Sequence, residues 1–157
     1  PLIFRWPGVL PASEESALPI SAMDLTATIA AAGGVSPPED KAFDGIDMVP
    51  TLLGEADVSE TRPLFFRRRD IKFRQNLNSI RQSAVRQGAW KYLRSYKKNN
   101  EKYTATLFDL DNDIAEQNDI SQTSPERFQE MSDLLENWES KVAKTAQPFP
   151  SVSGKSK

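Results

Sequence analysis

The strongest constraint on the fold is an apolar stripe near the end of the chain, over residues 125–144. Large apolar side chains recur there at the three- and four-residue spacing of one α-helix face. They are Phe128, Met131, Leu135, Trp138 and Val142. Ser124 can cap such a helix, and Pro125 suits its first position. We therefore expect a long helix that buries this stripe against a second layer, with Trp138 as its anchor.

Four short segments earlier in the chain predict that second layer as a β-sheet. They span residues 64–66, 79–86, 89–94 and 106–110. Each is rich in aliphatic and aromatic residues or alternates between apolar and polar ones, as strands do. Gln87-Gly88 forms a turn, and the strand after it places Trp90 and Tyr92 on one face and Lys91 on the other. The short connections favour an antiparallel meander, because parallel strands would need crossover helices.

The first 60 residues are expected to contribute a strand and two helical segments. The apolar run over residues 2–6 predicts a buried strand that belongs to a larger sheet, pairs with strands upstream and ends at a Pro-Gly pair. A helix begins after Ser21, where Asp24 in the first turn suits the positive end of the helix dipole. The residues expected to pack from this helix are Met23, Leu25, Ile29 and the alanine run. One or two further helical turns are expected within residues 46–54.

The chain contains no cysteine and no histidine. Their absence excludes thiolate and imidazole metal ligands, a Ser-His triad and a cysteine nucleophile from these 157 residues. With 38% apolar residues, the chain can still bury one core. It lacks an initiator methionine and a signal sequence, so we expect further residues upstream. No run approaches the roughly 20 apolar residues of a membrane span, and no membrane partner is predicted.

Positive charge is concentrated in the middle of the chain. Residues 62–102 carry 13 of the 20 Lys and Arg residues but only two of the 22 acidic ones. Such a region attracts polyanions, and guanidinium groups match a tetrahedral oxyanion such as sulfate. The candidate substrate-binding residues are Arg67, Arg68, Arg69, Lys72 and Arg74. The alternative is a solvated loop without a ligand.

Two further patterns have a competing interpretation. Tyr92, Tyr96 and Tyr103 are interleaved with basic residues, as on a surface that stacks nucleic-acid bases. No recognised nucleic-acid motif accompanies them, so nucleic acid is not the expected partner. The alternating Asp109, Asp111 and Asp113 are similar to a calcium loop but lack its glycine and distal glutamate. A polar turn whose carboxylates cap backbone amides is the preferred interpretation, and no metal residue is assigned.

Six strings in sequence order resemble the C-terminal region of formylglycine-dependent, arylsulfatase-like sulfatases of the alkaline phosphatase superfamily. They are residues 1–8, Asp24-Leu25, residues 44–50 with 53–55, residues 62–66, residues 84–92, and residues 107–110 with Asp113, Glu116 and Asn118. The most specific match is residues 84–92. Ile114 stands where the family usually has proline, so this loop is expected to turn differently.

The resemblance implies an α+β fold in three parts. Residues 1–60 would be the edge of an α/β sulfatase catalytic domain, and residues 61–146 a small antiparallel sheet packed against a C-terminal helix. Residues 147–157 are expected to form a flexible tail because Pro, Ser, Gly and Lys dominate there. The resemblance also implies an N-terminal sulfatase domain, not included here, that holds formylglycine beside a calcium ion. A sulfated substrate, such as a glycan, and a periplasmic or secreted location would follow.

No catalytic residue is assigned to this chain, because the Cys-x-Pro-x-Arg signature of the family is absent. We therefore expect the chain to belong to a sulfuric ester hydrolase but to be inactive alone. Its expected role is to support the sulfatase fold and to help bind the substrate. The alternative is a stand-alone, non-catalytic module that binds polyanions, either sulfated glycan or nucleic acid.

Overall fold

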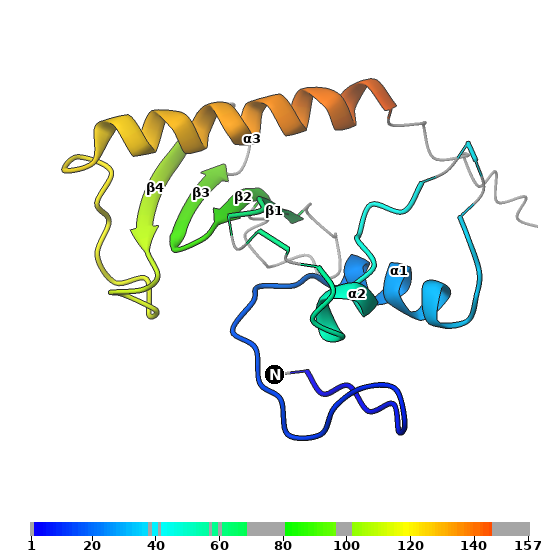
Figure 1. Ribbon diagram of the computed structural model, residues 1–157. Helices are drawn as coiled ribbons and strands as arrows, with labels where there is room; N and C mark the ends of the chain where they lie inside the picture. Colours follow the sequence, from blue (N-terminus) through cyan, green and yellow to red (C-terminus); the bar gives the residue numbers. More distant parts are fainter. Residues whose placement is uncertain are drawn as a thin grey trace, which may run out of the picture. The chain divides into compact units, whose positions relative to one another are not determined.

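The structure, a computed structural model, describes residues 2–37, 39–40, 42–56, 58–59, 61–68, 81–96 and 102–145 (Figure 1). Its elements in chain order are α1 (Ala22–Ala32), α2 (Val49–Leu52), β1 (Leu64–Arg68), β2 (Arg81–Gln87), β3 (Trp90–Tyr96), β4 (Tyr103–Asp109) and α3 (Pro125–Thr145). The chain divides into two compact units, residues 1–64 and 65–157. None of the helices described is both long and apolar enough to cross a membrane.

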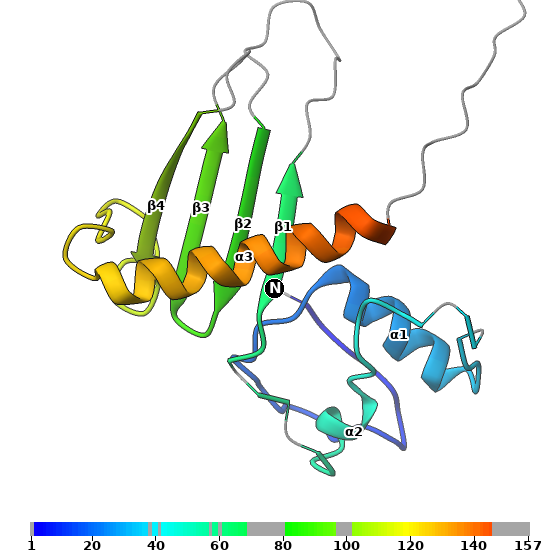
Figure 2. The ribbon, with the colours of Figure 1, turned by 90° about the horizontal axis from the view of Figure 1, so that it is seen from above.

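The second unit is built on a four-stranded antiparallel sheet that α3 covers on one face (Figure 2). The strand order β1-β2-β3-β4 follows the sequence. Across the middle of the sheet, Val85 lies opposite Tyr92, and Tyr92 lies opposite Leu107. Gly88, with φ of 58°, lies in the turn between β2 and β3, where the left-handed backbone conformation favours glycine. The predicted α+β meander with its covering helix is confirmed.

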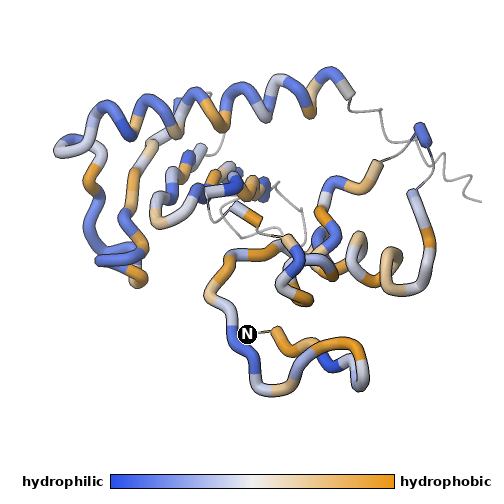
Figure 3. Tube along the Cα trace, viewed as in Figure 1, coloured by the Kyte–Doolittle hydropathy of each residue, from blue (hydrophilic) through white to orange (hydrophobic). Residues whose placement is uncertain are grey.

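The core between α3 and the sheet contains five fully buried side chains. They are Val85, Tyr92, Leu107, Met131 and Leu135. Aromatic contacts extend this core on both sides: the Phe65 and Trp138 rings stack with centroids 4.9 Å apart, and Phe128 packs edge-on against Tyr92 at 5.2 Å. Figure 3 shows the apolar positions recurring along α3 between hydrophilic ones. The stripe predicted from the sequence therefore faces the sheet.

The segment 2–6, which was expected to pair with strands upstream of residue 1, is not a strand within this chain. The segment has no regular secondary structure, and the Ile3 side chain is 89% exposed. A strand is stable only when another strand satisfies its backbone N–H and C=O groups. Among the described residues no strand pairs with this segment, so its pairing with upstream strands stays a prediction.

Helix α1 begins where the sequence predicts but buries a different face. Ser21 is its N-cap residue, and Asp24 lies in its first turn. Met23 and Ile29 were expected to pack, yet their side chains are 45% and 69% exposed. The buried residues of α1 are Asp24, Ala27 and Thr28. The reason is that hydrogen bonds made by Asp24 and Thr28 turn this small, polar face toward the loop before α2.

Candidate functional site

A buried carboxylate joins three segments of the first unit. The Asp24 side chain is fully buried, and its Oδ2 accepts hydrogen bonds from Ser21 N and Arg62 Nη2, both at 2.7 Å. Its Oδ1 accepts from Ile46 N at 3.0 Å and Arg62 Nη1 at 3.3 Å. Burial alone would raise the pKa of Asp24, but the hydrogen bonds from Arg62 and the backbone outweigh burial and lower this pKa below its ordinary value. Asp24 is therefore ionised at neutral pH.

Two further contacts fix α1 against the loop before α2. A Cβ atom on Gly45 would lie only 2.2 Å from the carbonyl carbon of Met23, so this close approach requires glycine. The Thr28 hydroxyl donates to Asp24 O at 2.6 Å and accepts from Met48 N at 3.0 Å. Because both Asp24 oxygens already have two donors each, the cluster holds the fold and leaves no carboxylate oxygen for a substrate.

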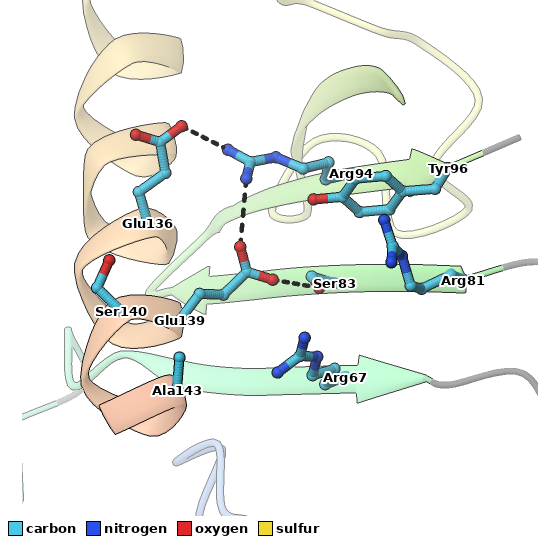
Figure 4. Close-up of a pocket in the computed structure, with 9 residues that line it drawn as sticks. All are labelled: Arg67, Arg81, Ser83, Arg94, Tyr96, Glu136, Glu139, Ser140 and Ala143. Carbon is cyan, nitrogen blue, oxygen red and sulfur yellow. Dashed lines mark hydrogen bonds and ion pairs between the residues drawn. The ribbon is translucent and has the colours of Figure 1, made fainter. Parts of the chain in front are cut away.

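The second unit carries the candidate binding site, a groove of about 460 Å³ between α3 and strands β1, β2 and β3 (Figure 4). The residues that line it are Arg67, Arg81, Ser83, Arg94, Tyr96, Glu136, Glu139, Ser140 and Ala143. Three arginines and two glutamates therefore face one hollow. The strand residues share one face of the sheet because Arg81 is opposite Tyr96, and Ser83 is opposite Arg94, across β2 and β3.

Arg94 forms the fixed floor of this groove. Its side chain is only 4% exposed and pairs with Glu136 at 3.0 Å and Glu139 at 3.3 Å. The Ser83 hydroxyl donates to the other oxygen of Glu139 at 2.7 Å. Burial alone would lower the pKa of Arg94, but hydrogen bonding to Tyr92 helps to hold this pKa above its ordinary value. Arg94 is therefore a permanent buried charge whose two Nη groups bond to protein partners, whereas its buried Nε has no hydrogen-bond partner among the described residues.

The predicted binding residues divide into three groups. Arg67 lines the groove from β1 (Figure 4). Arg68 is the next residue of β1 and is exposed outside the groove. Arg69, Lys72 and Arg74 lie outside the described residues. Arg81, Arg94 and Glu139 were not predicted from the sequence. Their only signals were the alternation along β2 and β3 and a polar position on the predicted helix.

The three predicted tyrosines have separate surroundings. Tyr92 is 1% exposed and belongs to the core. Tyr96 lines the groove, and the guanidinium carbon of Arg81 lies 4.0 Å from its ring centroid. Tyr103 is 43% exposed, with its ring centroid 5.4 Å from that of Tyr96. The three rings therefore do not form one open stacking surface.

The acidic loop after β4 caps its own backbone. The Asp109 carboxylate accepts from Asp111 N at 3.2 Å and Asn112 Nδ2 at 2.8 Å. The Asp113 carboxylate accepts from Asn118 N at 2.7 Å, and this backbone hydrogen bond lowers the pKa of Asp113. These contacts agree with the polar-turn interpretation. In the part of the chain that the structure describes, no three His, Cys, Asp or Glu side chains gather to hold a metal ion.

The chain matches one protein-family model and several curated proteins. Residues 1–145 match the family model described as N-sulphoglucosamine sulphohydrolase, C-terminal. The chain is 31% identical over 148 residues to N-acetylgalactosamine-6-O-sulfatase of Bacteroides thetaiotaomicron, which covers 87% of this chain and 26% of that protein. It is 42% identical over 65 residues to steryl-sulfatase of Rattus norvegicus, covering 41% of this chain and 11% of that protein.

A solved structure has the same fold over a similar span. Ps i-CgsB, in complex with k-i-k-neocarrahexaose, matches 85% of this chain and 27% of its own chain, with 28% identity and a TM-score of 0.61. The chain therefore spans about a quarter or less of the length of each of these proteins.

Proposed function

The chain belongs to the family of sulfatase regions described as N-sulphoglucosamine sulphohydrolase, C-terminal. On this premise we propose that it forms the C-terminal part of an enzyme that hydrolyses sulfate esters. The observation that carries this proposal is the contrast between the family match and the missing catalytic residue types. Residues 1–145 match a sulfatase family, yet the chain contains no cysteine and no histidine. The reacting groups are therefore expected in the rest of the enzyme, and this chain supports them.

We propose that formylglycine and calcium belong to that other part of the enzyme. The residues of this chain do not fit either group. It contains neither a Cys-x-Pro-x-Arg nor a Ser-x-Pro-x-Arg segment from which formylglycine could be made. Its described residues offer no group of three metal-ligating side chains. No step of sulfate ester hydrolysis is therefore assigned to this chain.

The proposed partner of the chain is an N-terminal sulfatase domain, and the proposed substrate class is a sulfated glycan. The name of the Bacteroides relative specifies a sulfated amino sugar, and Ps i-CgsB was solved in complex with k-i-k-neocarrahexaose. Arg67 and Arg68 on β1 would attract such a polyanion electrostatically. Arg69, Lys72 and Arg74 are proposed to act with them, although they lie outside the described residues.

The test is made on the full protein encoded by the gene of this chain. We expect a Cys- or Ser-x-Pro-x-Arg segment in frame or in an adjacent gene, and hydrolysis of 4-nitrophenyl sulfate by the purified protein. Replacing the Cys or Ser of that segment by Ala should abolish hydrolysis, and the 157-residue chain alone should show none. If no such segment exists and the chain alone binds polyanions, the stand-alone binding module is the better interpretation.

A further inference from the structure

The groove on the second unit contains two guanidinium groups that form no ion pair with an acid among the described residues. Arg67 and Arg81 both line it, and Figure 4 shows them on neighbouring strands. Among the described residues, neither forms an ion pair with a carboxylate, whereas Arg94 in the same groove pairs with two. In the part of the chain that the structure describes, the Arg67 and Arg81 donors therefore line the hollow without an acidic partner, which is the arrangement expected of an anion site.

Arg81 is held in place by an aromatic ring. Its guanidinium carbon lies 4.0 Å from the centroid of Tyr96, which is its direct neighbour across β2 and β3. A guanidinium over an aromatic face is attracted by the ring, and its in-plane N–H groups keep their hydrogen-bonding capacity. Tyr96 therefore reduces the freedom of Arg81 without occupying its donors, so less conformational entropy is lost when an anion binds.

The acidic residues of the groove are suited to sugar hydroxyl groups. Glu139 accepts hydrogen bonds from Ser83 and Arg94, which fix its orientation, while Glu136 is more than half exposed at the rim. Carboxylates accept hydrogen bonds from hydroxyl groups. The Ser140 hydroxyl, exposed on α3, lines the same hollow and can donate or accept. Anion donors and hydroxyl acceptors thus lie within one groove.

We propose that this groove binds one sulfated sugar residue of a glycan, with Arg67 and Arg81 donating to the sulfate group and Glu136, Glu139 and Ser140 bonding the sugar hydroxyls. The inference rests on the proposed function and specifies where the glycan is held. A sulfated glycan carries isolated anions separated by hydroxyl-rich rings, which matches a groove of mixed charge. A nucleic acid presents a continuous line of phosphates and few hydroxyl groups for Glu136 and Glu139 to accept from, and the Tyr96 ring is already covered by Arg81.

The test measures binding of a chondroitin 6-sulfate hexasaccharide, by isothermal titration calorimetry at low salt, to the full protein encoded by the gene of this chain. Where a Cys- or Ser-x-Pro-x-Arg segment is present, its Cys or Ser is replaced by Ala to prevent turnover. We expect Arg67→Gln and Arg81→Gln each to weaken binding about tenfold, because each removes a charge-assisted hydrogen-bond donor. Arg81→Lys should recover only part of the loss, since a lysine lacks the planar fork. Arg127→Gln is the control: it removes the same charge at the start of α3, where Arg127 pairs with Glu130. Near-UV circular dichroism checks that each variant is folded.

Three outcomes would overturn the inference. Equal binding of the chemically desulfated hexasaccharide would show that sulfate is not recognised. Equal losses in Arg67→Gln, Arg68→Gln and Arg127→Gln would show that only net charge matters, which removes the groove but leaves general attraction of polyanions intact. Tighter binding of an oligothymidylate, lost in the same two groove variants, would identify a nucleic-acid site. Hydrolysis of 4-nitrophenyl sulfate by the intact wild-type enzyme reports on the proposed function alone, so its success or failure is separate from these results.

Discussion

Asp24 and Arg62 are 38 residues apart in the chain, and their side chains form an ion pair at 2.7 Å. Removing one partner of a buried pair is strongly destabilising because the other charge loses its compensation. Arg62 keeps 23% of its side chain exposed, so part of that cost is recovered by hydration. We predict that Asp24→Asn lowers the free energy of unfolding of the first unit by about 3 kcal/mol. Amide hydrogen exchange at Ile46, whose N–H binds Asp24, is the local measurement.

A matched control and a pH series test this interpretation. Asp47→Asn makes the same change at an exposed residue that caps Val49 N, and it should cost less than about 0.5 kcal/mol. Because the pKa of Asp24 is lowered in the folded chain, its stabilising effect is fully present above the ordinary Asp pKa of about 4 and is lost as pH falls through the lowered value. The stability difference between wild type and Asp24→Asn should therefore shrink below about pH 4. An unchanged difference in strong acid would contradict the role assigned to the charge.

At the scale of secondary structure, α3 is attached to the sheet by aromatic as well as aliphatic contacts. Trp138 stacks on Phe65 of β1 with parallel rings, and Met131 and Leu135 are fully buried beside it. We predict that Trp138→Ala lowers the free energy of unfolding of the second unit by about 3 kcal/mol, because it removes a large packed ring. Urea denaturation followed by far-UV circular dichroism measures it.

The aromatic contact itself can be separated from the loss of apolar volume. In a double-mutant cycle, Phe65→Ala and Trp138→Ala should show a coupling free energy of about 1 kcal/mol. Asn137→Ala, at the exposed neighbour of Trp138, is the control and should change stability by less than about 0.5 kcal/mol. If Trp138→Ala is as mild as this control, the helix is not anchored by Trp138.

At the scale of the whole molecule, the family match confirms the resemblance to sulfatases over residues 1–145. We predict that replacing Arg67, Arg68 and Arg69 with Ser in the intact enzyme raises KM for a long sulfated glycan by about tenfold at low salt, because three positive charges are lost. The effect should decrease as salt screens these charges. Small aryl sulfates, which lack an extended polyanionic chain, provide the comparison substrate and should show little change. An unchanged KM for the long substrate at low salt would show that the three arginines only face water.

The elements that depend on local pattern were predictable from the sequence. The stripe from Phe128 to Trp138 predicted α3, because helical spacing and an N-terminal proline act within a few residues. The meander followed from short connections, although β3 extends to Tyr96 and β4 begins at Tyr103, beyond the predicted limits. Strand ends are less predictable because pairing with a neighbour extends them past the apolar residues.

Only the tertiary structure decided which polar groups meet. Arg67 was a candidate from its charge alone. Strand order and the path of α3 bring it into one groove with Arg81, Arg94 and Glu139. The buried face of α1 and the absence of a strand over residues 2–6 likewise depend on partners distant in sequence. The sequence by itself therefore determined the periodic elements and the family, since both are encoded in consecutive residues. The tertiary structure determined the ion pairs and the groove, because burial and Coulomb attraction depend on distance in space rather than along the chain.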